Sequence, residues 1–517
     1  MSAILRTLAV LAAGAVLPFA LAPFGLFPLM LVSAGALFWI LGRTQTGVGA
    51  FWAGWWFGVG KYGVGASWIY VSIHVFGAAS PALAIALVAL FVAGMALFTG
   101  VLGLAFHVVR GPPGPQGIPH RAGTRTAATH SAPSAGIVDA LAFATLWTAL
   151  EWVLTWFLTG FPWLFAGYAF IDTPLTGLAP VTGVLGMSFV AVLTAACLVI
   201  LPAQHSTRRR FLVLAAPAAL WVAAWSLQSV AWTERGASRS VALVQANVPQ
   251  DAKWERDRLP AWKARYGELT ARATDRDIVV WPEAAIPDYY HLAKAFIDAT
   301  VETLSGDLVQ GTVLAELDEG GTVTVYNAAV SSAGGIYKKR RLVPFGDYVP
   351  FESALRGLIG FFDLPMSRGT PGAETQPHLK AAGWDLAMAI CYEIAYPKAV
   401  AAHGRGADVL VTVSNDTWFG SSIGPLQHAQ MARMRAIENG KYLLRATNNG
   451  VTALIDDEGA VVAELPQFEQ GVLTGTVQAT AGLTPFARFL NAPLLSVFAI
   501  VGVGLGVVSV RRRRKAI

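Results

Sequence analysis

The chain has 517 residues, of which 54% are hydrophobic and only 14% are charged. Soluble globular proteins carry about a quarter charged residues, so this composition excludes an ordinary soluble protein and favours one that has lipid as part of its solvent. The formal net charge is +6, but the dense basic runs at 208–210 and 511–515 directly adjoin long apolar stretches. This distribution argues against nucleic-acid binding and is typical of a protein oriented in a membrane.

The chain contains eight apolar stretches long enough to cross a bilayer as helices, which takes about 20 residues. In chain order they are Leu5–Leu21, Phe24–Leu41, Val48–Ile69, Ala82–Val109, Ile137–Leu158, Val181–Leu201, Phe211–Val230 and, near the C-terminus, Leu494–Val510. We interpret the first as a helix and not as a cleaved signal peptide, because further spans follow at once. Residues 111–136 are rich in proline, glycine, serine and threonine, which predicts a flexible insertion.

Charges between these stretches predict how the protein lies in the membrane. The connections at 71–81 and 160–180 contain no lysine or arginine, and Lys61 is the one cation toward the outer end of a span. The opposing connections carry Arg43, then Arg110, Arg121 and Arg125, then residues 208–210, and finally residues 511–515. By the positive-inside rule, both termini lie in the cytoplasm and the polar segment between the seventh and eighth stretches lies outside it.

That polar segment, residues 240–483, has the composition of a globular domain. Short β-type runs alternate in it with helical stretches: the runs are Val241–Gln245, Ile278–Trp281, Leu308–Val313, Asp385–Cys391 and Val409–Ser414, and the helices include Arg258–Thr274 and Leu426–Glu438. This alternation predicts an α/β domain with a layered sheet. We therefore expect an N-terminal membrane domain of about seven helices over 1–236, an extracytoplasmic domain over 237–485, and a C-terminal helix with a basic tail over 486–517.

Three motifs in this segment place reactive side chains beside predicted strands. Glu283 ends Val280-Trp281-Pro282-Glu283, Lys339 lies in the basic run that leads to Asp347, and Cys391 closes an apolar strand. Strand ends deliver side chains to a common site, while the loops around them are free to vary. The only other cysteine, Cys197, lies in an apolar stretch, so we expect no disulfide framework.

The order Glu, Lys, Cys resembles that of the nitrilase or carbon–nitrogen hydrolase superfamily. With its apolar stretches, the whole chain is similar to the apolipoprotein N-acyltransferases of bacterial envelopes. Strings typical of that family lie at 63–74, 160–164, 245–250, 414–420 and 446–450. The resemblance implies a multi-pass α-helical membrane domain joined to a nitrilase-like αββα sandwich.

The resemblance also implies roles for the three reactive residues. Cys391 would be the nucleophile, and a thiol needs a positioned base because only a few per cent of it is ionised near neutral pH. Glu283 would be that base, and Lys339 would stabilise the oxyanion. Lys339 fits the motif better than Lys338, because it lies three residues before Leu342-Val343-Pro344.

The resemblance also implies roles at five further positions. Tyr392 and Glu393 would shape the site, and Trp254 and Trp418 would lie near an acyl pocket. Asp347 stands where the family usually has glutamate, so we expect a weaker or water-mediated contact to the site.

Each of these residues also has an ordinary structural reading. Cys391 alone could be a core cysteine, Glu283 a turn cap and Lys339 one of four solvated basic residues, and only their joint order favours catalysis. For the two tryptophans, core or membrane-interface packing is equally expected. Two histidines, His74 and His428, have no partners at metal-ligand spacing and are expected to be structural. Glu151 lies in a predicted span, where it could face a polar cavity or mark a helix end.

The predicted activity is a ping-pong acyl transfer. Cys391 would take a fatty acyl group from a membrane phospholipid and pass it to the N-terminal α-amine of a diacylglyceryl-cysteine apolipoprotein. The alternative is a membrane-tethered amidase or nitrilase with the same three residues; a non-catalytic scaffold or transporter is disfavoured by their intact order. We expect a monomer in the bacterial inner membrane, with no metal, organic cofactor or nucleic acid.

Overall fold

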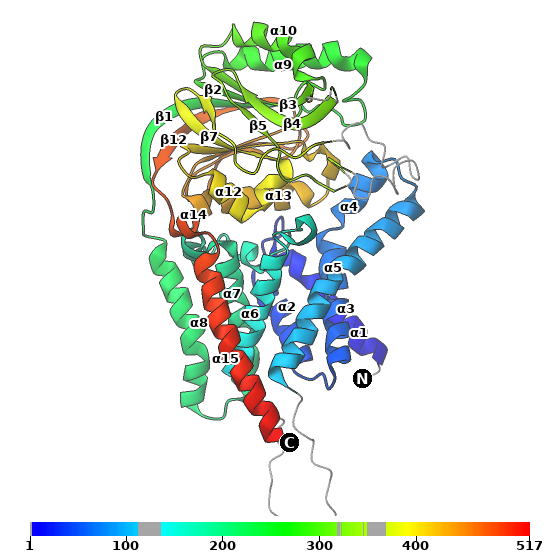
Figure 1. Ribbon diagram of the computed structural model, residues 1–517, viewed down its shortest axis with the longest axis vertical. Coiled ribbons are helices and arrows are strands. Elements are labelled where there is room, and N and C mark those ends of the chain that lie inside the picture. The colour runs from blue at the N-terminus through cyan, green and yellow to red at the C-terminus, as the bar shows by residue number, and fades with distance from the viewer. Residues whose placement is uncertain are drawn as a thin grey trace, which may run out of the picture.

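The computed structural model describes residues 3–111, 136–317, 321, 323–344, 346–348 and 369–516. The predicted insertion at 111–136 therefore lies, apart from its two end residues, outside the described residues. Figure 1 shows two halves, an α/β half above a bundle of helices whose far end holds both described chain ends.

Each of the eight predicted apolar stretches is helical. The helices of this half are α1 (Ala3–Val16), α2 (Pro28–Leu41), α3 (Gly47–Gly65), α4 (Trp68–Val71), α5 (Pro81–Arg110), α6 (Ile137–Val153), α7 (Ala179–Ile200), α8 (Thr207–Leu227) and α15 (Ala492–Ala516). The fifth predicted stretch was too long: α6 ends at Val153, because the chain turns at Leu158 and Thr159, both of which have positive φ. The first was also too long, since α1 ends at Val16 and a 3-10 turn follows.

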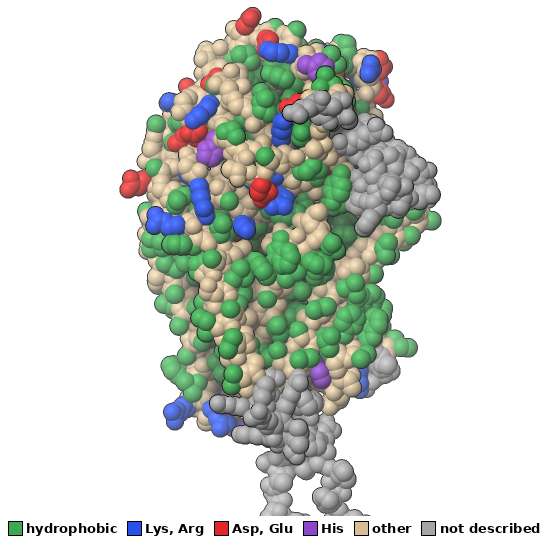
Figure 2. Space-filling view, in the orientation of Figure 1, with side chains coloured by type: hydrophobic (Ala, Val, Ile, Leu, Met, Phe, Trp, Pro, Cys, Tyr) green, Lys and Arg blue, Asp and Glu red, His purple; other side chains and the backbone are tan. Residues whose placement is uncertain are grey.

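Three stretches of the described chain are long and apolar enough to cross a membrane: Pro81–Arg110, Pro174–Ala203 and Thr207–Leu227. The apolar helices at Ile4–Ala20, Pro28–Leu41 and Ala492–Val507 are shorter. On the face shown in Figure 2, charged side chains gather over the α/β half and at the far end of the helices, and the band between them is almost entirely apolar or neutral. Such a band is what contact with hydrocarbon requires.

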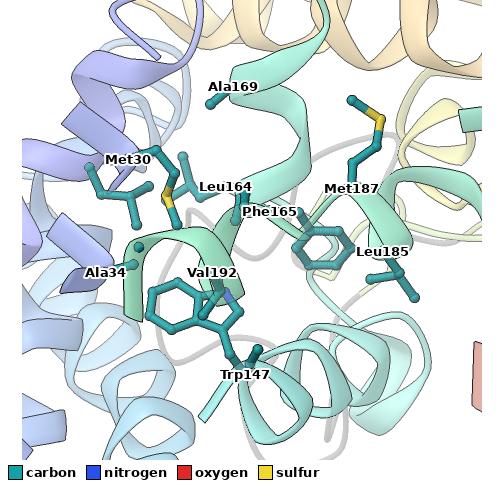
Figure 3. Packing of buried hydrophobic residues seen from close by; sticks show 14 of the residues in the cluster. Met30, Ala34, Trp147, Leu164, Phe165, Ala169, Leu185, Met187 and Val192 are labelled. Atoms are coloured by element: carbon teal, nitrogen blue, oxygen red, sulfur yellow. The ribbon is translucent and has the colours of Figure 1, made fainter. Parts of the chain in front are cut away.

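The helices pack around large apolar side chains that are almost fully buried. Figure 3 shows Met30 from α2, Trp147 from α6, Met187 and Val192 from α7, and Phe165 from the segment after α6 meeting in one cluster. The segment after α6 is thus part of the core. It lies directly beneath the α/β half, where a loop in contact with water would otherwise be expected.

The α/β half contains two six-stranded sheets. The first has the order β12-β1-β2-β3-β4-β5 and the second β11-β10-β9-β8-β7-β6. The strands are β1 (Glu234–Gln245), β2 (Ile278–Trp281), β3 (Asp307–Leu317), β4 (Val323–Ser331), β5 (Ile336–Lys338), β6 (Leu379–Ala381), β7 (Trp384–Ile390), β8 (Val409–Ser414), β9 (Leu443–Thr447), β10 (Thr452–Ile455), β11 (Val461–Leu465) and β12 (Gly471–Ala481). Both sheets are mixed: β1, β2 and β3 run parallel, as do β7, β8 and β9, and the outer pairs are antiparallel.

Helices cover the outer face of each sheet, which makes the predicted αββα sandwich (Figure 1). The helices are α9 (Leu259–Thr270) and α10 (Tyr290–Val301) on the first sheet, α12 (Pro397–His403) and α13 (Gly424–Asn439) on the second, and the short α14 (Pro485–Phe489). Fully buried valine, leucine and isoleucine side chains fill the space between the sheets. The central strands are apolar on both faces because each face is covered.

Helix α13 joins the two halves. The Gln427 side chain accepts a hydrogen bond from Trp163 Nε1 at 2.6 Å. Glu438 Oε1 accepts one from the backbone amide of Val184 at 2.8 Å, an amide that the non-helical φ of Gly183 leaves unpaired within α7. The second sheet and its helices are therefore attached through buried polar contacts to the helices below.

Candidate active site

Glu283 lies two residues beyond the end of β2, in a buried position between the sheets. Its Oε1 accepts hydrogen bonds from Asn327 Nδ2 at 2.7 Å and from Lys339 Nζ at 3.3 Å. Its Oε2 accepts one from the backbone amide of Asn415 at 2.8 Å. Both carboxylate oxygens are thus oriented by donors from different strands, and a carboxylate held in this way is oriented for proton transfer.

The backbone of Glu283 rests against β3 at Gly311. A Cβ added to Gly311 would lie 2.5 Å from both the Glu283 Cα and the Pro282 carbonyl oxygen. Only glycine therefore allows β3 to approach the Glu283 turn this closely.

We expect Gly311→Ala to lower the rate of the predicted acyl transfer by about 100-fold, because a catalytic group displaced by roughly 1 Å loses about that much. The rate should be measured on purified protein of confirmed fold. Gly236→Ala is the matched control, since a Cβ on that β1 glycine meets nothing closer than 3.6 Å and the rate should not change. Equal rates for both variants would contradict the role of this contact.

Lys339 follows β5 and is 1% exposed. Its Nζ lies 3.3 Å from Glu283 Oε1 and 2.8 Å from Asp347 Oδ2. Asp347 Oδ2 also accepts the backbone amide of Val343 at 2.8 Å. The structure places Asp347 in direct contact with Lys339, where the sequence left a weaker or water-mediated contact as the expectation. The backbone amides of Gly346 and Asp347 both donate to the Val343 carbonyl, and this turn brings the shorter side chain within reach.

Cys391 is the first residue after β7, not its last as the sequence suggested, and it opens the 3-10 helix η10 (Cys391–Ala395). Its φ is +52°, a left-handed conformation that costs about 1–3 kcal/mol in residues other than glycine. Buried Glu393 holds this turn, accepting from the amide of Ile390 at 2.8 Å, the Tyr337 hydroxyl at 3.0 Å and the amide of Arg340 at 2.7 Å. Glu393 therefore ties the cysteine turn to the segment that carries Lys339.

The charges of the site act on one another. Burial alone would raise the pKa of Glu283, but the Lys339 ammonium and the bonds from Asn327 and Asn415 hold that pKa below its usual value. Burial alone would lower the pKa of Lys339, but the carboxylates of Asp347 and Glu283 raise it well above normal. Desolvation, and then the Glu283 charge, raise the pKa of the Cys391 thiol. The resting site therefore holds a carboxylate, an ammonium and a protonated thiol.

Tyr392 and Trp418 lie where the α/β half meets the helices. The Tyr392 hydroxyl donates to the Gly160 carbonyl at 3.2 Å, and its ring stacks on Trp163. The carbonyl of Trp418 accepts from the Ser72 hydroxyl at 2.8 Å. Both residues thus link the cysteine side of the sandwich to the helices below, and their roles toward a substrate stay predictions.

Trp254 is half-buried in the turn after β1, and it is the preceding residue, Lys253, that contacts Glu283. Lys253 is 1% exposed, and its Nζ donates to the Glu283 carbonyl oxygen at 3.3 Å. Burial lowers the pKa of Lys253 to about 8, although the nearby Glu283 carboxylate acts to raise it. The family resemblance marked Trp254 in the sequence and gave no signal for Lys253 beside it.

Two further residues of the site were missed. Asn327 projects from the antiparallel strand β4, where no sequence motif marks it. Asn415 lies in the family string at 414–420, but the sequence gave no role to its backbone amide, which donates to Glu283. Within the described residues, no group of three His, Cys, Asp or Glu side chains is placed to hold a metal ion.

Comparisons with known proteins identify both halves. Residues 13–197 match the family model of the apolipoprotein N-acyltransferase N-terminal domain, and residues 240–486 match that of the carbon–nitrogen hydrolases. Apolipoprotein N-acyltransferases of Pseudomonas aeruginosa and Azotobacter vinelandii are 44% and 45% identical, over 95% and 97% of this chain and 93% and 94% of theirs. The chain belongs to the apolipoprotein N-acyltransferase family.

The same likeness extends to more distant members of the family. The enzyme of Coxiella burnetii is 36% identical over 95% of this chain and 97% of its own. Among solved structures, a nitrilase-superfamily protein of Saccharomyces cerevisiae has a TM-score of 0.36 and 20% identity, over 47% of this chain and 91% of that one. The resemblance inferred from the sequence is thus confirmed at the level of the family.

Proposed function

We propose that this family member transfers a fatty acyl group from a membrane phospholipid to the N-terminal α-amine of a diacylglyceryl apolipoprotein. The observation that carries the proposal is the contact of Lys339 with Glu283 beside the Cys391 turn, at the junction with an apolar helical half. A carboxylate, an ammonium and a thiol are the groups that acyl transfer through a thioester needs.

In the first half-reaction, Cys391 Sγ attacks the ester carbonyl of the phospholipid and its proton passes to the Glu283 carboxylate. Lys339 stabilises the oxyanion of the tetrahedral intermediate; a fixed donor of this kind contributes about 3 kcal/mol. The C–O bond then breaks, and the departing lysophospholipid oxygen takes the proton from Glu283. A thioester on Cys391 remains.

In the second half-reaction, the α-amine of the apolipoprotein attacks the thioester carbonyl and gives a proton to Glu283. Lys339 again stabilises the oxyanion, and the C–S bond breaks. The departing sulfur recovers the proton from Glu283, leaving an amide and the free thiol. Each proton that Glu283 accepts is returned within the same half-reaction, so one carboxylate serves both.

The proposed setting is a bacterial inner membrane, crossed several times by residues 1–236 and once by residues 486–517. The arginines of the connections at 42–47 and 202–210 support a cytoplasmic position for that end of the bundle. Residues 237–485 then form the catalytic domain on the extracytoplasmic side. The site can act as a monomer, because all its residues come from one chain.

The test is transfer of label from acyl-labelled phospholipid to the protein and then to a diacylglyceryl peptide. We expect hydroxylamine-sensitive label on the wild type and none on Cys391→Ala, with Cys197→Ala, a buried cysteine of α7, as the matched control that keeps full label. Label on Cys391→Ala would point to another nucleophile. Hydrolysis of small amides without any label would favour the tethered amidase.

A further inference from the structure

A buried polar cluster lies behind Cys391, and the proposed mechanism does not use it. Its centre is Asp416, in the 3-10 helix η11 (Asp416–Phe419), which is 1% exposed. Asp416 Oδ1 accepts from the Ser414 hydroxyl at 2.6 Å, and Oδ2 accepts from an Arg445 guanidinium nitrogen, also at 2.6 Å. Burial alone would raise the pKa of Asp416, but Arg445 and His428 lower it to about 2, so this carboxylate stays charged.

His428 on α13 connects this cluster to the backbone of the cysteine. Its Nε2 lies 3.1 Å from the Cys391 carbonyl oxygen. A carbonyl oxygen only accepts hydrogen bonds, so Nε2 carries a hydrogen there. The other ring nitrogen, Nδ1, lies 3.1 Å from Asp416 Oδ1 and 3.2 Å from Arg445. The ring is therefore fixed at both nitrogens and holds the strained Cys391 turn from behind.

The pairing of β7 with β8 brings Ser414 next to Cys391. These strands run parallel with Ile390 opposite Val413, so Cys391 and Ser414 are the next residues along each strand. Burial and then the Glu283 charge raise the pKa of the Cys391 thiol, and the neighbouring Ser414 hydroxyl lowers it. Ser414 thus lies beside the reacting residue and donates to a fixed carboxylate.

A serine hydroxyl has one hydrogen but two acceptor sites. While Cys391 is a thiol, that hydrogen is directed to Asp416, which is permanently charged and 2.6 Å away. When Glu283 removes the thiol proton, the sulfur becomes the second anion within reach of the hydroxyl. Asp416 can then lose the hydrogen bond from the Ser414 hydroxyl and still be paired, because Arg445 donates to its other oxygen.

We propose that Ser414 is a further catalytic residue, which donates its hydroxyl hydrogen to the Cys391 thiolate, and that Asp416, His428 and Arg445 position it. This role rests on the proposed function, since it matters only if the thiolate of Cys391 is the nucleophile. No bond to carbon forms or breaks at Ser414. The hydroxyl turns from Asp416 to the sulfur as negative charge develops, and turns back when the thioester forms.

The ionisation of Cys391 tests this role without any acyl transfer. The charged or titratable groups around the thiol come from several elements: Glu283 after β2, Lys339 after β5, Asp416 in η11, His428 on α13 and Arg445 on β9. A change at Ser414 removes none of these charges, and Asp416 keeps its ion pair with Arg445 when it loses the Ser414 hydroxyl. A shift in thiol ionisation on changing Ser414 therefore reports the hydroxyl itself.

The experiment is alkylation of Cys391 by iodoacetamide in the detergent-solubilised full-length protein, followed by mass spectrometry across pH. We expect Ser414→Ala to raise the pKa of the thiol by about one unit and so to slow alkylation at neutral pH about tenfold, since one pKa unit is a factor of ten in thiolate. Ser414→Thr, which keeps the hydroxyl, should resemble the wild type. Ser414→Val, in which valine has nearly the shape of threonine but no hydroxyl, should resemble the alanine variant.

Thr412→Val is the matched control, because Thr412 is buried two residues earlier on β8 and its hydroxyl has no hydrogen-bond partner among the described residues. Either pair, wild type with Ser414→Ala or Ser414→Thr with Ser414→Val, decides the question if the other fails to fold. Equal alkylation rates within a folded pair overturn the role of Ser414. Such a result would leave the proposed function intact, because that function depends on the label at Cys391 and is tested separately.

Discussion

Replacing Lys339 by methionine should reduce acyl transfer by at least about 100- to 1,000-fold, the loss that follows removal of one oxyanion donor. The same change should destabilise the protein, because Glu283 and Asp347 lose the ammonium that lies 3.3 Å and 2.8 Å from them. Removing one partner of a buried ion pair typically costs about 3–5 kcal/mol. Both effects have one cause: a single buried cation pairs with two carboxylates and, in the proposed mechanism, stabilises the oxyanion.

Lys338→Met is the matched control for this variant. Lys338 is the preceding residue, and its Nζ pairs with Glu316 at 2.6 Å on the surface. Exposed ion pairs contribute about 0–1 kcal/mol, so this variant should keep its activity and nearly all of its stability. Thioester formation and thermal unfolding should both be measured. A larger loss of thioester formation in Lys338→Met than in Lys339→Met would show that the oxyanion donor has been misassigned.

Replacing Glu283 by glutamine should lower the rate of both half-reactions by about 100- to 10,000-fold, which is the usual contribution of a general base. Glutamine has nearly the same shape, and its oxygen can still accept from Lys339 or Asn415, but it cannot take the thiol proton. The change should therefore remove proton transfer while preserving the fold. Glu302→Gln, at the exposed end of α10, should leave both rates unchanged.

The pH dependence of the wild type follows from the same carboxylate. Because the folded-state pKa of Glu283 lies below 4.5, the acid limb of kcat/KM that reports this carboxylate should lie below pH 4.5. The stability that Glu283 contributes is present above its unfolded-state pKa and is lost as pH falls through the lower folded-state value. Lys339→Met should move the acid limb to higher pH, and Glu283→Gln should lack it. An acid limb unchanged in Glu283→Gln would assign it to another group.

Two of the three main residues of the site could be predicted because they follow strands that have parallel neighbours in the sheet. Glu283 and Cys391 each follow a short apolar run, and runs of that kind reveal a strand and its end without any knowledge of the rest of the chain. Lys339 was distinguishable from Lys338 only through the family motif. Alternation along β5 sends these two side chains in opposite directions, one into the site and one to the surface.

The residues that were missed or misjudged depend on contacts between distant parts of the chain. Asn327 reaches Glu283 from an antiparallel strand, across 44 positions of sequence. Lys253 reaches the Glu283 carbonyl across 30 positions, although its neighbouring tryptophan was the expected residue. Asp347 reaches Lys339 because a turn brings it back. In each case the direction of a side chain is decided by packing, which is not encoded by local spacing.

Composition and the order of apolar stretches determined that this chain has a helical half for a lipid setting and an α/β half carrying Glu283, Lys339 and Cys391. These properties are local: apolar length, strand alternation and motif order are each contained in a few neighbouring residues. Only the tertiary structure decided how the site is held, through the hydrogen bonds that Tyr337 of β5 and the backbone amide of Arg340 donate to Glu393 beneath the cysteine turn. Those contacts depend on which strand ends become neighbours when two sheets stack, and this in turn depends on the burial of apolar surface from the whole chain.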